Sequence, residues 1–427
     1  MLAGIIVIVI FFGSLYLIFS EKLNRTITAL AGSMLTIVVG RIMGFYSEEQ
    51  AITAIDFNTL GLLLGMMILV AMLEPTGFFQ YLAVLAARSS KGNPTRLFFL
   101  LAAITTVLSM FLDNVTTVVL IAPVTLLICE ILGIMSLPFL ITEALISNIG
   151  GVATLVGDPP NVLIASAAPL SFNDFLIHSL PIVLVVWVGV MFLLKYLFRA
   201  ELAVRPRKAK AVMKLNPAET LNHPATARQL LIVLGAAILF FFVHHFLHVA
   251  PSLVALTASA VALVWVRPDI NQTLKHVEWS VLVFFGALFV MVGGLEAAGV
   301  LDALIGLLEP LTSVPPILFG IGMIWVVALL SAVVDNVPIT IALIPVIHGL
   351  GASGMNVQPL WWALAFGAGF GGTGTIIGST ANVIVANLSE RTRHPITPAI
   401  WNKRGPLVLL TTCAITSVLY AILYWTF

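Results

Sequence analysis

The chain has 427 residues, of which 60% are hydrophobic and only 9% are charged, and its mean hydropathy is +1.10. Soluble domains carry about 25% charged residues, so this composition excludes a water-soluble globular protein. The net charge is only +1, and no nucleic-acid partner is expected. Apolar stretches of about 20 residues recur along the whole chain, which predicts an all-α polytopic membrane protein in the lipid bilayer.

Hydropathy in chain order predicts full membrane spans separated by two long interrupted regions and two broken spans. The first segment has no basic leader region and no small-residue cleavage site, so we expect a retained span. The predicted full spans are 2–19, 26–43, 57–74, 176–198, 228–248, 250–266, 280–298 and 406–426.

Each interrupted region, 97–132 and 316–350, contains an Asp-Asn pair inside an apolar run. An acidic residue near the bilayer centre costs about 2.5–3.5 kcal/mol on insertion scales. Both regions are too short to cross the membrane twice comfortably, and hydroxyl side chains follow both pairs. We therefore predict re-entrant hairpins with tips at mid-membrane, where exposed backbone is tolerated only if it lines a cavity.

The spans at 139–168 and 359–388 contain helix-breaking strings, "GDPPN" in the first and "GSTAN" in the second. Two consecutive prolines remove two amide donors and force the preceding residues out of helix. We predict broken helices whose N-termini and side chains face the hairpin tips.

The hairpin and the broken helix both occur twice. A shift of 222 residues places Asp113-Asn114-Val115 on Asp335-Asn336-Val337, and a shift of 221 places "GGVATLVGDPPNV" on "GGTGTIIGSTANV". The predicted organisation is repeat 1 at 1–198, a basic linker at 199–227 and repeat 2 at 228–427. Each repeat holds about five full crossings, which is odd, so the two repeats have inverted topology. Inverted repeats are typical of secondary transporters.

The basic residues give an independent orientation. With the first loop in the cytoplasm, 19 of the 20 Lys and Arg residues fall on that side and only Arg41 falls outside, as the positive-inside rule requires. This predicts that both termini lie outside and the linker lies in the cytoplasm. Few apolar residues of the linker could dock, so we expect it to be dispensable for folding.

The hairpin tips and broken helices are predicted to enclose one substrate- or ion-binding site. Its candidate residues are Asp113, Asn114, Thr116, Thr117, Gly157, Asp158, Asn161, Asp335, Asn336, Thr340, Gly378, Ser379 and Asn382. Asp113, Asp158 and Asp335 are candidates for proton coupling, because burial raises a carboxyl pKa and a bound cation lowers it. Asp158 is the stronger candidate for the proton carrier, since its repeat partner Ser379 cannot titrate.

Other acidic residues have simpler interpretations. Glu130 and Glu143 are expected at the membrane interface, and a role for Glu74 or Glu296, which match in the repeat, stays open. Cys129 and Cys413 give neither a disulfide framework nor a metal-ligand spacing. No cofactor or metal site is predicted beyond protons, and Na⁺, as coupling ions.

"FLDNVTTVVLIAPVT", "NIGGVATLVGDPPNVLI" and "GTIIGSTANVIVA" resemble the arsenite permease/NhaD antiporter family of the ion transporter superfamily, in the branch of the melanosomal P protein. The resemblance implies elevator-type alternating access, a homodimer in the plasma membrane, and a cytoplasmic ATPase subunit as a partner. It places proton-coupled efflux of arsenite or antimonite first, Na⁺/H⁺ antiport second and organic anion transport (citrate or a dicarboxylate) third.

Two protein classes other than a carrier are alternatives to this interpretation. An intramembrane aspartyl protease needs a Gly-x-Gly-Asp string and a Tyr-Asp pair, and the sequence has neither around Asp158. We therefore expect no enzyme and no catalytic residues. An ion channel could use rings of Asp, but broken helices in inverted repeats are better suited to alternating access.

Overall fold

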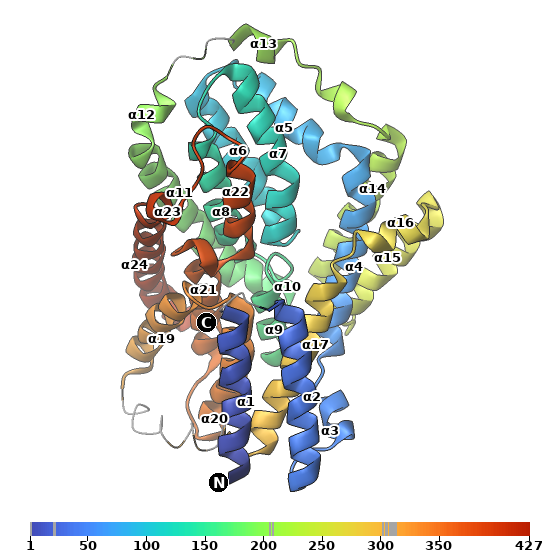
Figure 1. The fold of residues 1–427 in the computed structure, drawn as a ribbon, viewed down its shortest axis with the longest axis vertical. Helices are drawn as coiled ribbons and strands as arrows, with labels where there is room; N and C mark the ends of the chain where they lie inside the picture. Colours follow the sequence, from blue (N-terminus) through green and yellow to red (C-terminus); the bar gives the residue numbers. More distant parts are fainter. Residues whose placement is uncertain are drawn as a thin grey trace.

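The computed structural model describes residues 2–19, 23–204, 206, 209–300, 303, 306 and 314–427. These described residues form helices joined by short turns, with no β-strand among them (Figure 1). Seven described helices are long and apolar enough to span a membrane, and shorter apolar helices lie between them. The predicted all-α polytopic fold is confirmed.

The helices pack in two bundles, which we call the first and second bundle (Figure 1). The first bundle contains α1 (Leu2–Phe19), α2 (Arg25–Met43), α3 (Glu48–Thr53), α4 (Phe57–Leu73), α14 (Pro224–Val243), α15 (Pro251–Val266), α16 (Ile270–Lys275) and α17 (Trp279–Ala297). The second bundle contains α5 (Phe78–Ser89), α6 (Pro94–Ser109), α7 (Asn114–Leu132), α8 (Leu137–Gly151), α9 (Pro159–Ala167), α10 (Phe172–Asp174), α11 (Leu180–Leu197), α19 (Pro316–Ser331), α20 (Asn336–Ala352), α21 (Gln358–Gly371), α22 (Thr380–Ser389), α23 (Pro398–Asn402) and α24 (Gly405–Leu423).

The helix pairings follow the internal repeat. In the first bundle α4 packs on α15 and α2 packs on α17, so each pair joins a helix of one repeat to a helix of the other. In the second bundle α6 packs on α8 as α19 packs on α21. Close approach needs small residues: a methyl group on Gly65 would lie 2.5 Å from the Ala255 carbonyl carbon. The inverted repeat is thus visible in the packing.

The hairpins are α6–α7 and α19–α20, and an aspartate ends each tip. Asp113 is the N-cap of α7 and accepts a hydrogen bond from the Thr116 amide at 2.9 Å. Asp335 is the N-cap of α20 and accepts from the Val337 amide at 3.4 Å. An aspartate at this position satisfies an amide that the helix itself leaves unpaired, so each tip turns directly into a helix.

The broken helices are α8–α9 and α21–α22. Each break is closed by an asparagine from the helix that follows it. Asn161 donates to the carbonyls of Gly151, Val152 and Thr154 at 3.1, 3.3 and 2.8 Å. In the other repeat, Asn382 donates to the carbonyls of Gly372 and Thr375 at 2.7 and 2.9 Å. These amides satisfy backbone carbonyls that a continuous helix would have paired.

The linker docks on the second bundle, contrary to the expectation from its composition. It forms α12 (Arg199–Leu202), which packs on α11, then α13 (Ala209–Met213), which packs on α5 and α7, and a 3₁₀ turn, η3 (Pro217–Thr220), which packs on α5 (Figure 1). Val212 is fully buried in the main core. Gly77 has φ +79°, and a side chain there would collide with the Thr220 carbonyl oxygen. The linker therefore docks through at least one buried apolar side chain, and its dispensability for folding stays a prediction.

Glu143 also lies elsewhere than expected. It is inside α8 with 1% of its surface exposed, rather than at a membrane interface. One carboxyl oxygen accepts a hydrogen bond from the Thr125 hydroxyl at 2.5 Å. The hydropathy pattern places this residue near the start of a span, but α7 packs against that part of α8 and covers it.

Candidate functional site

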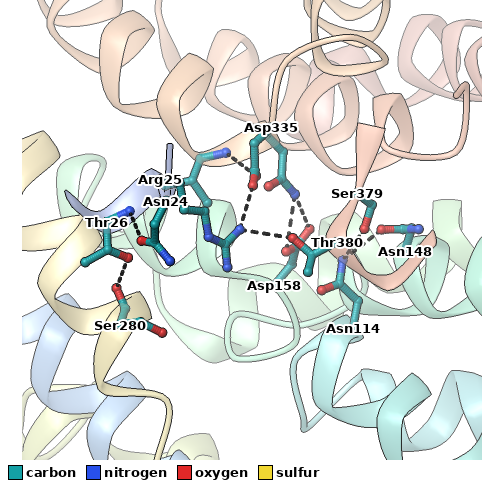
Figure 2. A network of polar contacts seen from close by, with 12 residues as sticks. Asn24, Arg25, Thr26, Asn114, Asn148, Asp158, Ser280, Asp335, Ser379 and Thr380 are labelled. Carbon is teal, nitrogen blue, oxygen red and sulfur yellow. Dashed lines mark hydrogen bonds and ion pairs between the residues drawn. The ribbon is translucent and has the colours of Figure 1, made fainter. Parts of the chain in front are cut away.

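Both hairpin tips and both helix breaks meet at one cavity of about 230 Å³ between the bundles (Figure 2). The second bundle contributes the tips and breaks, and α2, α4 and α17 of the first bundle form the opposite wall. Its polar lining residues are Arg25, Glu74, Asp113, Asn114, Thr116, Asp158, His276, Glu278, Asp335, Asn336, Ser379 and Thr380.

The asparagine of each tip reaches the break of the other repeat. The Asn336 amide donates to the two carboxyl oxygens of Asp158 at 3.1 and 3.4 Å. The Asn114 amide lies 3.5 Å from the Ser379 hydroxyl, which is the repeat partner of Asp158. In both halves of the site, therefore, a tip asparagine faces the break of the other repeat, but one break offers a carboxyl and the other a hydroxyl.

Asn148, in the last turns of α8, connects the hairpin tip of repeat 1 to the helix break of repeat 2 (Figure 2). Its side-chain oxygen accepts from the Asn114 amide at 2.8 Å, and its amide donates to the Asn382 oxygen at 3.1 Å and the Ala144 carbonyl at 2.9 Å. Because it has 1% of its surface exposed, leaving these partners unpaired would be costly.

The three aspartates have different environments. Asp113 is half-buried and caps α7. Asp335 caps α20 and pairs with Arg25, whose Nη1 lies 3.3 Å from Oδ2. Asp158 is at the N-cap position of α9 but makes no capping hydrogen bond, and it is 1% exposed. Asp158 is therefore the most enclosed of the three carboxyl groups, and Asn336 is its hydrogen-bond partner among the described residues.

The predicted site residues fall into two groups. Seven line the cavity: Asp113, Asn114, Thr116, Asp158, Asp335, Asn336 and Ser379. The other six are structural neighbours of it: Thr117, Gly157, Asn161, Thr340, Gly378 and Asn382. Asn161 and Asn382 brace the breaks, and Thr340 donates to the Asn336 carbonyl at 2.8 Å. A methyl group on Gly157 would lie 2.6 Å from two carbonyl oxygens, so this position needs glycine.

The sequence did not single out five polar residues at the cavity or in its network: Arg25, Asn148, His276, Glu278 and Thr380. Arg25 and Glu278 lie at the N-terminal ends of α2 and α17. In the sequence nothing distinguishes them from the charged residues of ordinary loops. Glu74, whose role was left open, also lines the cavity. Among the described residues, no three His, Cys, Asp or Glu side chains are placed to hold a metal ion.

Glu278 lies just before α17, outside the spanning helix. Burial and, to a smaller extent, the charge of Asp113 raise its pKa, the Arg25 guanidinium offsets part of this increase, and the resulting pKa is about 7. A carboxyl with this pKa changes charge near neutral pH. The cavity therefore contains a group whose charge depends on pH near neutrality.

This cavity has the features of a carrier site: two hairpin tips, two broken helices and an inverted repeat. Residues 15–367 match the protein family CitMHS, described as Citrate transporter. The chain belongs to this family. The prediction of a membrane transporter of the ion transporter superfamily is therefore supported. The family that matches is described as a citrate transporter, and membership of the arsenite permease/NhaD family is not shown.

Relatives extend over the whole chain. A "46 kDa membrane protein" of Mycobacterium leprae is 40% identical, with 97% of each chain covered. An "Uncharacterized transporter" of Mycobacterium tuberculosis, Rv2684, is 38% identical, again with 97% of each covered. The human "P protein" is 32% identical over 97% of this chain, which spans 58% of that longer protein.

Among solved structures, the YdaH transporter of Alcanivorax borkumensis has a similar fold. Its TM-score is 0.59 and its identity is 19%, with 87% of this chain and 86% of that chain covered. At this identity the likeness concerns the fold alone. Together these comparisons identify a multi-pass membrane transporter and leave its substrate to be proposed.

Proposed function

We propose that this protein is a secondary carrier of organic anions of the citrate class, which it moves together with protons. The observation that carries the proposal is the convergence of four helix N-termini on one cavity. The first residues of α7, α9, α20 and α22 all line it: Asn114, Pro159, Asn336 and Thr380. Helix N-termini carry partial positive charge and bind anionic groups, and transporters use broken helices in this way.

The carboxyl groups around the cavity explain why protons must accompany an anion. Glu74, Asp113, Asp158, Glu278 and Asp335 all line it, whereas Arg25 supplies the guanidinium. Like charges repel strongly at short distance in a medium of low dielectric constant. An organic anion can enter only when several of these carboxyl groups are protonated, so binding of the anion and binding of protons favour each other.

Asp158 is our candidate for the proton carrier. It is enclosed, its repeat partner Ser379 cannot titrate, and the Asn336 amide can donate to it when it is charged. A protonated Asp158 removes one negative charge from the inner wall of the cavity. Asp113 and Asp335 are more accessible and are proposed to take part in binding, with their oxygens capping the helices that face the substrate.

The arrangement of the bundles supports alternating access of the elevator type. The two bundles enclose the site, and they contact each other less extensively than the helices within each bundle do. The cavity lies against Arg25 and Glu278, which stand at the ends of α2 and α17 rather than at their midpoints. Sliding of the second bundle along the first would carry the tips towards the opposite ends of these helices.

The membrane arrangement is proposed on the same basis as in the sequence: a homodimer in the plasma membrane, with both termini outside and the linker in the cytoplasm. The distribution of Lys and Arg supports this orientation, whereas the homodimer and the plasma membrane rest on the family resemblance alone. A cytoplasmic ATPase partner stays a prediction of the family resemblance.

The second candidate is cation/proton antiport, which the five carboxyl groups of the cavity favour. Purified protein in proteoliposomes distinguishes the candidates, with labelled citrate, Na⁺ and arsenite compared under one imposed pH gradient. We expect saturable citrate accumulation and exchange with unlabelled citrate on the far side. Na⁺ or arsenite flux without citrate flux would replace the proposal, and flux that neither saturates nor exchanges would indicate a channel.

A further inference from the structure

Arg25 enters the site from the first bundle. It is the first residue of α2, and its side chain extends to the tip of the second hairpin (Figure 2). Nη1 lies 3.3 Å from Asp335 Oδ2 and 3.0 Å from the Thr380 hydroxyl. Asp335 caps α20 and Thr380 begins α22, so one guanidinium nitrogen contacts the hairpin tip and the helix break of repeat 2 together.

Helix stability does not explain an arginine at this position. The N-terminus of a helix carries partial positive charge, so a cation in the first turn is unfavourable. Asn24 already caps α2 by accepting from the Thr26 and Ile27 amides. The contacts of the side chain supply a reason for a cation here that the helix itself does not supply.

Part of the Arg25 guanidinium is available to donate further hydrogen bonds. Among the described residues, only Nη1 of Arg25 has hydrogen-bond partners, which leaves the edge formed by Nε and Nη2 for a ligand. The guanidinium lies 5.6 Å from the centre of the Phe284 ring, which restricts its orientation. The side chain of Arg25 is 33% exposed, and it lines the cavity.

The charges around the cavity favour binding of an anion at the Nε and Nη2 edge of Arg25. Of the described residues that line the cavity, Arg25 is the only Lys or Arg, and it faces the carboxyl groups of Asp113, Asp158, Glu278 and Asp335 together with His276. Arginine binds carboxylates through two parallel N–H···O bonds, which a lysine cannot form. A carboxylate of a substrate therefore finds its one fixed cationic partner here.

We propose that Arg25 is a specificity-determining residue that binds a carboxylate of the substrate through its Nε and Nη2 edge, while Nη1 stays on Asp335 and Thr380. The inference rests on the proposed transport of organic anions and adds the residue that selects the carboxylate. Because Arg25 belongs to the first bundle, the substrate is held by both bundles in this conformation. Movement of the second bundle separates the substrate from Arg25, so this contact acts in one of the two access states.

The test compares Arg25→Gln and Arg25→Lys with a control, Arg41→Gln. Arg41 lies at the other end of the same helix and pairs with Glu48 at the surface, so its removal changes the net charge equally. Citrate KM and kcat are measured in proteoliposomes, with thermal unfolding of each purified variant. We expect Arg25→Gln to raise the citrate KM by about 10-fold or more, with a smaller change in kcat. Arg25→Lys should be intermediate and Arg41→Gln unchanged.

A second readout separates ligand binding from bracing of the hairpin tip. Citrate is competed with unlabelled analogues that carry one, two or three carboxylates. In the wild type, the affinity for an analogue should increase with each carboxylate that it carries. In Arg25→Gln, one of these increases should be lost, because one carboxylate no longer has its cationic partner. An unchanged citrate KM in folded Arg25→Gln overturns the inference and leaves the proposed function intact. An equal loss of kcat for all analogues with no change in KM, or a low melting temperature in both Arg25 variants, assigns Arg25 a structural role and also overturns it. If the wild type transports no carboxylate, the proposed function itself fails.

Discussion

The two repeats build the same half-site twice, but with two chemical differences. In each, a tip asparagine reaches across to the break of the other repeat: Asn336 to Asp158, and Asn114 to Ser379. One break carries a carboxyl where the other has a hydroxyl. One tip, at Asp335, is paired with a guanidinium from the first bundle, whereas Asp113 has no such ion pair within the described part of the chain.

The comparison separates the parts that hold the site from the parts that do its chemistry. Asn161 and Asn382 brace the two breaks in the same manner, so the bracing is common to both halves. The proposed proton carrier, Asp158, and the proposed anion partner, Arg25, each occur once. On this proposal the duplicated fold supplies a symmetric frame, and differences at single positions within it supply proton coupling and selectivity.

The largest expected effect comes from removing the Asp158 carboxyl, and placing a carboxyl in the other half of the site should reverse part of it. Asp158→Asn should abolish citrate accumulation driven by a pH gradient, because the enclosed proton site is lost, while exchange of citrate across the membrane continues. Both fluxes are measured in proteoliposomes. The double variant Asp158→Ser with Ser379→Asp should recover part of the accumulation, since Asn114 can face the new carboxyl as Asn336 faces the old one. No recovery in a folded double variant would mean that the two halves are not equivalent frames.

Removing the Asn148 contacts, which connect the hairpin tip of repeat 1 to the helix break of repeat 2, should have the next largest effect. Asn148→Ala leaves the Asn382 oxygen without its partner and the buried Asn114 amide with only the longer contact to Ser379, at about 1–3 kcal/mol for an unsatisfied buried group. We expect a lower melting temperature and slower citrate transport. Asn271→Ala, at an exposed position in α16, is the matched control. Equal melting temperatures for the two variants would contradict the connecting role.

Glu278 sharpens the comparison through pH, because it lies near Asp113 rather than near the enclosed Asp158. Burial raises its pKa to about 7, so the proton is bound below that value and lost above it. Loss of the proton adds a negative charge to the cavity, and citrate affinity should fall as the pH rises from about 6 to about 8. Glu278→Gln stays neutral and should flatten this part of the profile. Glu49→Gln, exposed in α3, should keep the wild-type profile; a flattened profile there would remove Glu278 from the explanation.

The linker gives the smallest expected effect, since it lies outside both half-sites. Val212 is fully buried, whereas the neighbouring Met213 is 52% exposed. Val212→Ser should lower the free energy of unfolding by about 1–3 kcal/mol because it buries a hydroxyl and loses apolar contact. Met213→Ser should leave the melting temperature nearly unchanged. If Val212→Ser also leaves it unchanged, the docking contributes no stability.

The sequence predicts the hairpins and the helix breaks better than the side-chain contacts between them. Intramembrane aspartates and double prolines are strong local signals, and their repetition at one offset points to the hairpins, the breaks and seven of the cavity-lining residues. Arg25 and Asn148 carry no such support, because the shifts that align the repeats place them opposite Leu247 and Gly369. Their roles arise only when α2 meets the second hairpin and α8 meets α22. Burial of Glu143 and Val212 likewise depends on helices distant in sequence.

The central claim is that both repeats contribute to one anion site. It is tested most directly by equilibrium binding of labelled citrate to the purified wild type, Asn114→Ala and Asn336→Ala, with thermal unfolding as a check of folding. Asn114 and Asn336 occupy equivalent positions and both line the cavity. We predict that each substitution raises the citrate Kd by about 10-fold or more, the loss expected for one hydrogen bond to a charged group. Wild-type affinity in either folded variant would contradict a shared site.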